Sequence, residues 1–199
     1  MMKNLLAATV LGLSMASAAS ATVVLQDDFN YGSGNTLNIG ANFLAPNWTA
    51  GPWIDYLSDP STYGYLCQGT GGCLDLDGSG NSSGLLLSVI SFAAGTYELS
   101  FELFGNGRGA AADTVTITLG NIVIPIINIA SSDDVSTIVP ITFTTTGGFL
   151  TFKNSGGDNQ GAILSSVTLS AVPLPAGGLL LIGALGGLAA LRRRKAAAV

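Results

Sequence analysis

Residues 96–103 read T-Y-E-L-S-F-E-L, and their strict alternation of apolar and polar side chains decides the fold. A β-strand sends successive side chains to opposite faces of a sheet. This strand would therefore have one apolar face and one polar face, made respectively by Tyr97, Leu99, Phe101 and Leu103 and by Glu98, Ser100 and Glu102. Such a strand is half-buried, with one face on a core and the other in solvent.

The sequence on either side repeats this pattern. Residues 114–119 alternate in the same way with threonine outward, and turn residues separate this segment from its neighbours. Short strands at spacings of roughly ten residues, with no helical period between residues 22 and 171, are typical of an all-β antiparallel β-sandwich. We expect a jelly roll, with further strands at 23–25, 85–92, 122–129, 135–144, 149–153 and 163–171.

Both ends of the chain differ from this body. Residues 1–21 match a secretory signal peptide, with Lys3 in the positive region, an apolar stretch at 5–13, and Ala19-Ser20-Ala21 at the cleavage site. We therefore expect a signal peptide at 1–21 and a single β-sandwich domain at 22–171. Signal peptidase and the general secretion machinery are its expected partners.

The C-terminal segment has three parts in a fixed order. A short proline-containing motif at 172–176 precedes an uncharged apolar run at 177–191, and four cations follow, namely Arg192, Arg193, Arg194 and Lys195. A helix rises about 1.5 Å per residue, so this run is only marginally long enough for a hydrocarbon core of roughly 30 Å. We expect a transmembrane helix whose basic stop holds the C-terminus on the cytoplasmic side.

This order of parts resembles the PEP-CTERM class of bacterial protein-sorting signals. The five residues of the motif resemble its VPLPA-type variant: Val172, Pro173, Leu174, Pro175 and Ala176. The resemblance implies that an exosortase-type membrane protease cuts near the motif. It also implies transient anchoring in the inner membrane of a Gram-negative envelope, followed by release to the cell surface or extracellular matrix. An ordinary C-terminal membrane anchor is the alternative, and it also exports the body.

The charge of the body limits its partners. All 12 acidic residues lie within 22–171, against the two cations Arg108 and Lys153, which gives a net charge of −10. Such a domain repels nucleic acid and anionic lipid, and it favours neutral ligands or cations. The chain contains no histidine, so the usual base of nucleophilic catalysis is missing.

The two cysteines, Cys67 and Cys73, are expected to form a disulfide in an oxidising compartment. Because the loop between them is short, the bridge should contribute at most about 2 kcal/mol and serve mainly to fix one loop.

The segment after Cys73 contains candidate calcium ligands. Asp75, Asp77 and Ser79 alternate as in the first half of an EF-hand loop, although Leu86 stands where that loop has its bidentate glutamate. A Ca²⁺ site would need carboxylates or carbonyls from elsewhere in the chain. The alternative is a tight, solvated loop between strands.

Aromatic residues gather between positions 43 and 65. Trp53, Tyr56 and Tyr63 are candidate carbohydrate-binding residues, because an aromatic face packs against the apolar face of a pyranose ring. Core packing is the alternative for each of them, and it is the favoured reading for Trp48.

The body also resembles the galactose-binding-domain-like jelly rolls found in carbohydrate-binding modules. Four stretches carry the resemblance: 73–78 (C-L-D-L-D-G), 94–101 (A-G-T-Y-E-L-S-F), 105–108 (G-N-G-R) and 157–161 (G-D-N-Q-G). Ser165 and Ser166 replace an acidic pair that such modules often place before the last strand. The resemblance implies carbohydrate binding, and this departure weakens any calcium or sugar site carried over to the final strand.

The sequence therefore predicts an exported, non-catalytic protein of the cell surface or extracellular matrix that binds carbohydrate such as exopolysaccharide. One alternative is a self-associating structural surface protein, which outward rows of threonine and serine would suit. Another is a small glycoside hydrolase or lyase that uses paired carboxylates, either Asp75 with Asp77 or Asp27 with Asp28.

Overall fold

The computed structural model describes residues 20–37, 45–51, 53–58, 67, 71–80, 82–109, 111–132, 140–173 and 186. Within them, Ala21–Pro173 belongs to one compact unit. Almost all of the expected signal peptide, the transmembrane helix at 177–191 and the basic stop at 192–195 lie outside the described residues, as does most of the VPLPA-type motif. In the described part of the chain, no helix is long and apolar enough to cross a membrane.

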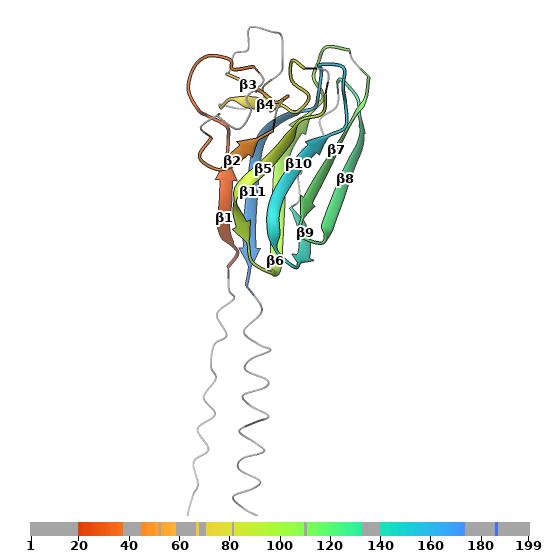
Figure 1. Ribbon diagram of the computed structural model, residues 1–199. Coiled ribbons are helices and arrows are strands. Elements are labelled where there is room, and N and C mark those ends of the chain that lie inside the picture. Colours follow the sequence, from red (N-terminus) through yellow and green to blue (C-terminus); the bar gives the residue numbers. More distant parts are fainter. Residues whose placement is uncertain are drawn as a thin grey trace, which may run out of the picture. The chain divides into compact units, whose positions relative to one another are not determined.

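Two antiparallel sheets form the compact unit, which confirms the predicted β-sandwich (Figure 1). The first sheet has the order β3-β4-β11-β6-β9, and β1 also pairs with β11. Its strands are β1 (Thr22–Asp27), β3 (Asp55–Leu57), β4 (Cys73–Asp75), β6 (Gly95–Phe104), β9 (Ile141–Thr145) and β11 (Ile163–Val172).

The second sheet has the order β2-β5-β10-β7-β8. Its strands are β2 (Trp48–Ala50), β5 (Leu85–Phe92), β7 (Asp113–Leu119), β8 (Ile122–Ile129) and β10 (Gly148–Asn154). From β5 to β7 and again from β8 to β11, successive strands alternate between the two sheets, as in a jelly roll. Residues far apart in the sequence therefore meet at each end of the sandwich.

The core lies between the sheets, on the face that the alternation of 96–103 predicts. Leu99 and Leu103 are fully buried on β6, and the register of β6 with β11 places Leu99 opposite Leu169. Trp48 is also in the core, as expected, with its ring centroid 6.0 Å from that of Phe152 on β10. Aromatic rings of this size supply much of the apolar area that stabilises a small sandwich.

The three shortest strands, β2, β3 and β4, escaped the sequence prediction. Each has three residues, which is too short for an alternation to be recognised, and each lies in a part of the chain rich in glycine or proline. Pairing with other strands holds them in place: β2 pairs with the longer β5, β4 pairs with the longer β11, and β3 pairs with β4.

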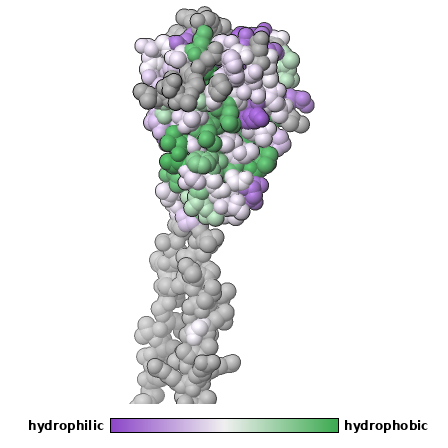
Figure 2. Space-filling view, viewed as in Figure 1, coloured by the Kyte–Doolittle hydropathy of each residue, from purple (hydrophilic) through white to green (hydrophobic). Residues whose placement is uncertain are grey.

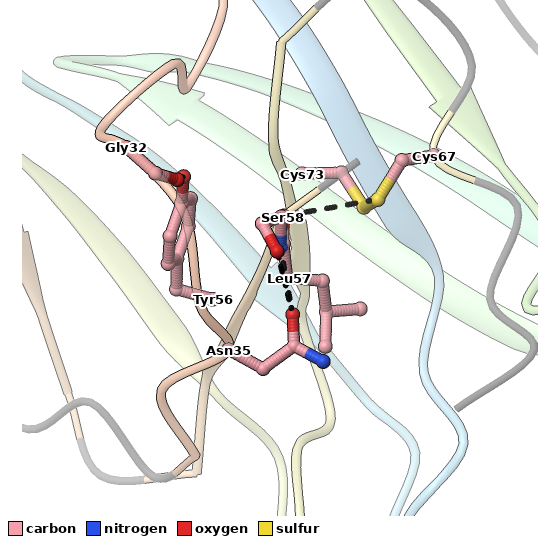
Figure 3. Close-up of a disulfide and its surroundings, with 7 residues drawn as sticks. All are labelled: Gly32, Asn35, Tyr56, Leu57, Ser58, Cys67 and Cys73. Carbon is pink, nitrogen blue, oxygen red and sulfur yellow. Dashed lines mark hydrogen bonds between the residues drawn. A yellow bond between two sulfur atoms is a disulfide. The ribbon is translucent and has the colours of Figure 1, made fainter. Parts of the chain in front are cut away.

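The predicted disulfide between Cys67 and Cys73 is present and joins the loop before β4 to β4 itself (Figure 3). Close by, the loop at 31–37 is fastened to β3. The Asn35 carboxamide oxygen accepts hydrogen bonds from the backbone N–H and the hydroxyl of Ser58, and the Tyr56 hydroxyl donates to the Gly32 carbonyl at 2.8 Å. The bridge and these bonds together fix two loops on one edge of the sheet.

Candidate functional site

Asp75, at the end of β4, is fully buried and has partners on both carboxylate oxygens. Its Oδ1 accepts the backbone N–H groups of Asp77 and Gly161, each at 3.0 Å. Its Oδ2 lies 3.2 Å from Nη2 of Arg108 in an ion pair. Asp75 therefore acts as the acceptor of a structural network that includes two backbone N–H groups and Arg108.

The same network joins three loops that the sequence resemblance had singled out separately. Arg108 also donates to the carbonyl of Asn159 at 2.8 Å, and the Asn106 side-chain amide donates to the carbonyl of Gln160. The loops at 75–80, 105–109 and 157–161 thus meet at one end of the sandwich. Sequence analysis missed this network because its members are 33 to 86 residues apart in the chain.

Asp75 and Ser79, two of the three candidate calcium ligands, have different partners in the folded chain. The Ser79 hydroxyl donates to Oδ2 of Asp55 at 2.6 Å, whereas Asp75 faces Arg108. Among the described residues, no three acidic, cysteine or histidine side chains are grouped so as to hold a metal ion. The alternative of a solvated loop is wrong for Asp75 and Asp77, because both residues are 0% exposed.

Asp77 belongs instead to a second buried cluster, with Asp113 at the start of β7 and Asn154 at the end of β10. Oδ2 of Asp77 accepts the N–H of Asp158 at 3.1 Å, and the Asn154 side-chain amide donates to Oδ1 of Asp113 at 3.0 Å. The sequence assigned no role to Asp113 or Asn154. Their positions at strand ends give no signal until the order of the strands is known.

Burial raises the pKa of the carboxyl groups in both clusters. Loss of hydration raises the pKa of Asp75 to about 7, despite the opposing effects of the Asp77 N–H, Arg108 and the Gly161 N–H. Burial likewise raises the pKa of Asp113 to about 6. The hydrogen bond from the Asn154 amide lowers this pKa, and the negative charges of Asp158 and Asp77 raise it further. The pKa of Asp77 is also raised, first by burial.

These shifts predict an unusual pH dependence of stability in the cation-free protein. The three carboxyls bind protons more tightly in the folded chain than in the unfolded one, where the pKa of aspartate is about 3.9. Their contribution is therefore fully present below about pH 4 and is lost as the pH rises through 6 and 7. With a chelator present, the thermal midpoint should fall by several degrees between about pH 5 and pH 8.

Circular dichroism melts at fixed ionic strength would measure this dependence. The Asp113→Asn variant should show a weaker slope between pH 5 and 7, because it no longer titrates at that position. A midpoint that stays level or rises with pH would contradict the expectation.

Asp27 accepts the hydrogen bonds of a third buried cluster. This cluster lies where β1 of the first sheet is beside β2 of the second. Its Oδ1 accepts the N–H of Phe29 at 2.9 Å. Its Oδ2 accepts three side-chain donors: the Tyr31 hydroxyl at 2.6 Å, the Asn47 amide at 2.9 Å and the Trp48 indole N–H at 3.0 Å. Burial, followed by the bond to Asp27, raises the pKa of Tyr31. The tyrosine therefore remains a donor at neutral pH.

A pocket of about 410 Å³ opens beside this cluster, over the paired strands β1 and β11. The two strands pair with Gln26 opposite Thr168, so their polar side chains share one face. The Ser166 hydroxyl donates to Glu102 of β6 at 3.0 Å. The residues lining the pocket are Gln26, Asp27, Asp28, Ser166 and Thr168.

The three aromatic candidates do not form one exposed surface. Tyr56 is only 3% exposed, because its ring packs on Tyr31 under the loop at 31–37. It therefore offers no face for stacking a sugar, which corrects that expectation. Trp53 is half-buried with its ring against Gly80 and its backbone at φ 74°, and Tyr63 lies outside the described residues.

No protein-family model and no curated protein match this chain in sequence. Similar solved structures include the C-terminal CBM6 of LamC, a laminarinase from Zobellia galactanivorans, at 10% identity and a TM-score of 0.39, with 68% of this chain and 98% of that one covered. Another comprises the CBM22-1 and GH10 modules of Clostridium thermocellum xylanase 10B, at 12% identity and a TM-score of 0.43, with 76% and 29% covered.

A third is the Podospora anserina GH26-CBM35 β-(1,4)-mannanase, at 15% identity and a TM-score of 0.34. This chain covers 29% of that protein, and 71% of this chain is aligned. The names of all three include carbohydrate-binding modules. At such low identities, no binding residue can be carried over from them to a position of this chain.

Proposed function

We propose that this chain is an exported, non-catalytic protein of the cell surface or extracellular matrix that binds a neutral carbohydrate such as exopolysaccharide. The observation that carries the carbohydrate-binding part is the pocket over the paired strands β1 and β11, with its lining of hydroxyl, carboxylate and amide groups. Its volume lies in the range of about 300–1,000 Å³ that small-molecule sites occupy.

The chemistry of the lining suits sugar hydroxyl groups. The carboxylate of Asp28 can accept hydrogen bonds from these hydroxyl groups. The hydroxyl of Thr168 and the amide of Gln26 can both donate and accept hydrogen bonds. The described residues that line the pocket include no cationic side chain, and the domain carries a net charge of −10. A neutral saccharide therefore suits it better than a uronic-acid or sulfated polymer.

The partners of the acidic residues support binding over catalysis. Glycosidases generally use two carboxyl groups that face each other roughly 5–10 Å apart across the scissile bond. In the two pairs considered from the sequence, Asp75 is bound to Arg108 and two N–H groups, and Asp27 accepts four donors. Carboxylates used in this way hold loops in place.

Export and sorting rest on the two terminal segments of the sequence. We propose processing by signal peptidase near Ala21 and by an exosortase-type protease near the motif at 172–176. Mass spectrometry of the mature protein from its native cells would test both. An intact C-terminal segment retained in the membrane would favour the ordinary anchor instead.

A glycan array followed by calorimetric titration tests the binding site. Thr168→Val removes one hydroxyl at nearly constant shape, and Ser166→Ala removes another. Each loss should weaken binding by roughly 2- to 10-fold, since a neutral hydrogen bond contributes about 0.5–1.5 kcal/mol. Thr142→Val, an exposed threonine on β9 of the same sheet, is the matched control and should leave the affinity unchanged.

Trp53→Ala separates the pocket from the other candidate surface. If this variant abolishes binding while Thr168→Val and Ser166→Ala retain it, the sugar binds at the loop end and the pocket assignment is wrong. An array on which the wild-type protein binds no glycan would remove carbohydrate binding altogether.

Exposed apolar side chains favour self-association as a second candidate function. Val89 and Phe149 are 52% and 46% exposed on β5 and β10 of the second sheet, and Val123 on β8 is 61% exposed. Figure 2 shows apolar surface gathered on the face in view. Contiguous exposed apolar area commonly marks a contact surface. Light scattering that rises with protein concentration, and falls for Val89→Lys, would favour this function.

A further inference from the structure

Three buried oxygen atoms of the second cluster lack a hydrogen-bond partner in the described part of the chain. They are Oδ1 of Asp77, Oδ2 of Asp113 and Oδ1 of Asn154. The three residues are 0%, 3% and 0% exposed. A buried acceptor without a donor is costly and rare in folded proteins, so three in one place point to something that fills the space between them.

The three side chains converge on one point of the backbone. A Cβ added to Gly156 would lie 2.5 Å from Oδ2 of Asp77, 2.6 Å from Oδ1 of Asp113 and 2.8 Å from Nδ2 of Asn154. The three atoms nearest to this point form hydrogen bonds within the protein. The other carboxylate oxygen of Asp77 and of Asp113, and the amide oxygen of Asn154, have no hydrogen-bond partner among the described residues. Glycine at position 156 leaves room for this convergence.

The charge around this point is negative and uncompensated. Asp158 adds a further acidic residue beside the cluster, since its backbone N–H donates to Oδ2 of Asp77 at 3.1 Å. The body has only two cationic side chains. Arg108 is paired with Asp75, and Lys153 is exposed on the outer face of β10. Neutralisation by the protein itself is therefore not available to Asp77 and Asp113.

We propose that these residues bind a calcium ion, held by Oδ1 of Asp77, Oδ2 of Asp113 and Oδ1 of Asn154. Oxygen-only ligands of this kind suit a hard cation, and Ca²⁺ accepts irregular sets of six to eight oxygens, of which water molecules can supply the remainder. The proposed site contains only two acidic residues, and its third ligand is an amide. It is therefore consistent with the finding that no three acidic, cysteine or histidine side chains are grouped in the described part of the chain. Soft metals such as zinc are disfavoured, since the chain lacks histidine.

The ion would act as a clamp between the two sheets. Asp77 follows β4 of the first sheet, whereas Asp113 and Asn154 belong to β7 and β10 of the second. Asp158 lies in the loop before β11. The site is thus distinct from the pocket over β1 and β11, and it does not depend on the proposed carbohydrate binding.

Calcium titration of the chelator-treated, full-length chain tests the proposal at pH 7.5. At a hundredfold excess over Kd, CaCl₂ should raise the thermal midpoint by about 5–10 °C, because the ion binds only the folded state. Magnesium chloride should have a smaller effect, since Mg²⁺ demands a near-octahedral site. The absence of any calcium-induced shift in the wild-type chain would overturn the proposal.

Two substitutions locate the ion. Asp113→Asn should abolish most of the calcium-induced shift, whereas Glu98→Gln, which removes one negative charge on the outer face of β6, should retain it. A shift that persists unchanged in Asp113→Asn places calcium elsewhere and contradicts the site.

A third variant keeps the test decisive if Asp113→Asn fails to fold. Asn154→Asp adds a third carboxylate to the cluster, so it should destabilise the calcium-free protein and bind calcium at least 10-fold more tightly. Terbium luminescence, with displacement by Ca²⁺, reports this affinity directly. If Asn154→Asp binds calcium no better than the wild type, the amide oxygen is not a ligand and the proposal fails.

Discussion

Replacing Asp75 with alanine is expected to lower the free energy of unfolding by about 2–4 kcal/mol, because two backbone N–H groups lose a buried acceptor and each such loss costs about 1–3 kcal/mol before relaxation. The carboxylate accepts two backbone N–H groups and pairs with Arg108. Its removal would leave the N–H groups of Asp77 and Gly161 without that acceptor. It would also leave the guanidinium without its counter-charge, so the loops at 75–80 and 157–161 would loosen together.

Urea unfolding at a fixed calcium concentration measures this loss. Arg108→Ala, made alone and together with Asp75→Ala, completes a double-mutant cycle that gives the coupling between the two side chains. Asp28→Ala, an exposed aspartate on the same domain, is the matched control and should change stability by less than about 0.5 kcal/mol. A loss below about 1 kcal/mol for Asp75→Ala would show that water replaces the carboxylate.

Some of the acidic side chains that give the body its negative charge lie inside the fold and not on its surface. Among the residues that the structure describes, five acidic side chains are buried, namely Asp27, Asp55, Asp75, Asp77 and Asp113. Composition alone assigns all of them to the surface, where they would repel anions. In the folded chain these five carboxylates serve chiefly as hydrogen-bond acceptors between loops, and the charge presented to solvent is smaller than −10.

Local alternation was sufficient to predict the sandwich. Tyr97 to Leu103 and Val115 to Leu119 bury every second side chain, as their sequences indicate. The sites depend on contacts that no local pattern records. Asp75 and Asp77 lie in a stretch typical of a solvated turn, and their burial follows from loops some 30 and 80 residues further along the chain.

The proposed pocket illustrates the same limit. Ser166 and Thr168 are outward residues of one strand, and alternation predicts that they are polar and solvated. A hollow forms there only because β1 pairs with β11 in a register that places Gln26 beside Thr168. Strand order and register, which bring the first and last strands together, therefore create a site that neither strand encodes alone.

Asp27→Ala is expected to destabilise the fold by about 3 kcal/mol, because several donors lose one shared acceptor and each buried loss costs about 1–3 kcal/mol before relaxation. One of those donors, the Trp48 indole, belongs to β2 of the second sheet, whereas Asp27 ends β1 of the first. The carboxylate thus ties the two sheets together where β1 ends.

Denaturant unfolding of Asp27→Ala beside Asp28→Ala compares a buried and an exposed carboxylate at adjacent positions. Tyr31→Phe removes one of the four bonds and should cost about 1–2 kcal/mol. Equal stability of Asp27→Ala and Asp28→Ala would mean that packing alone joins the sheets at this point.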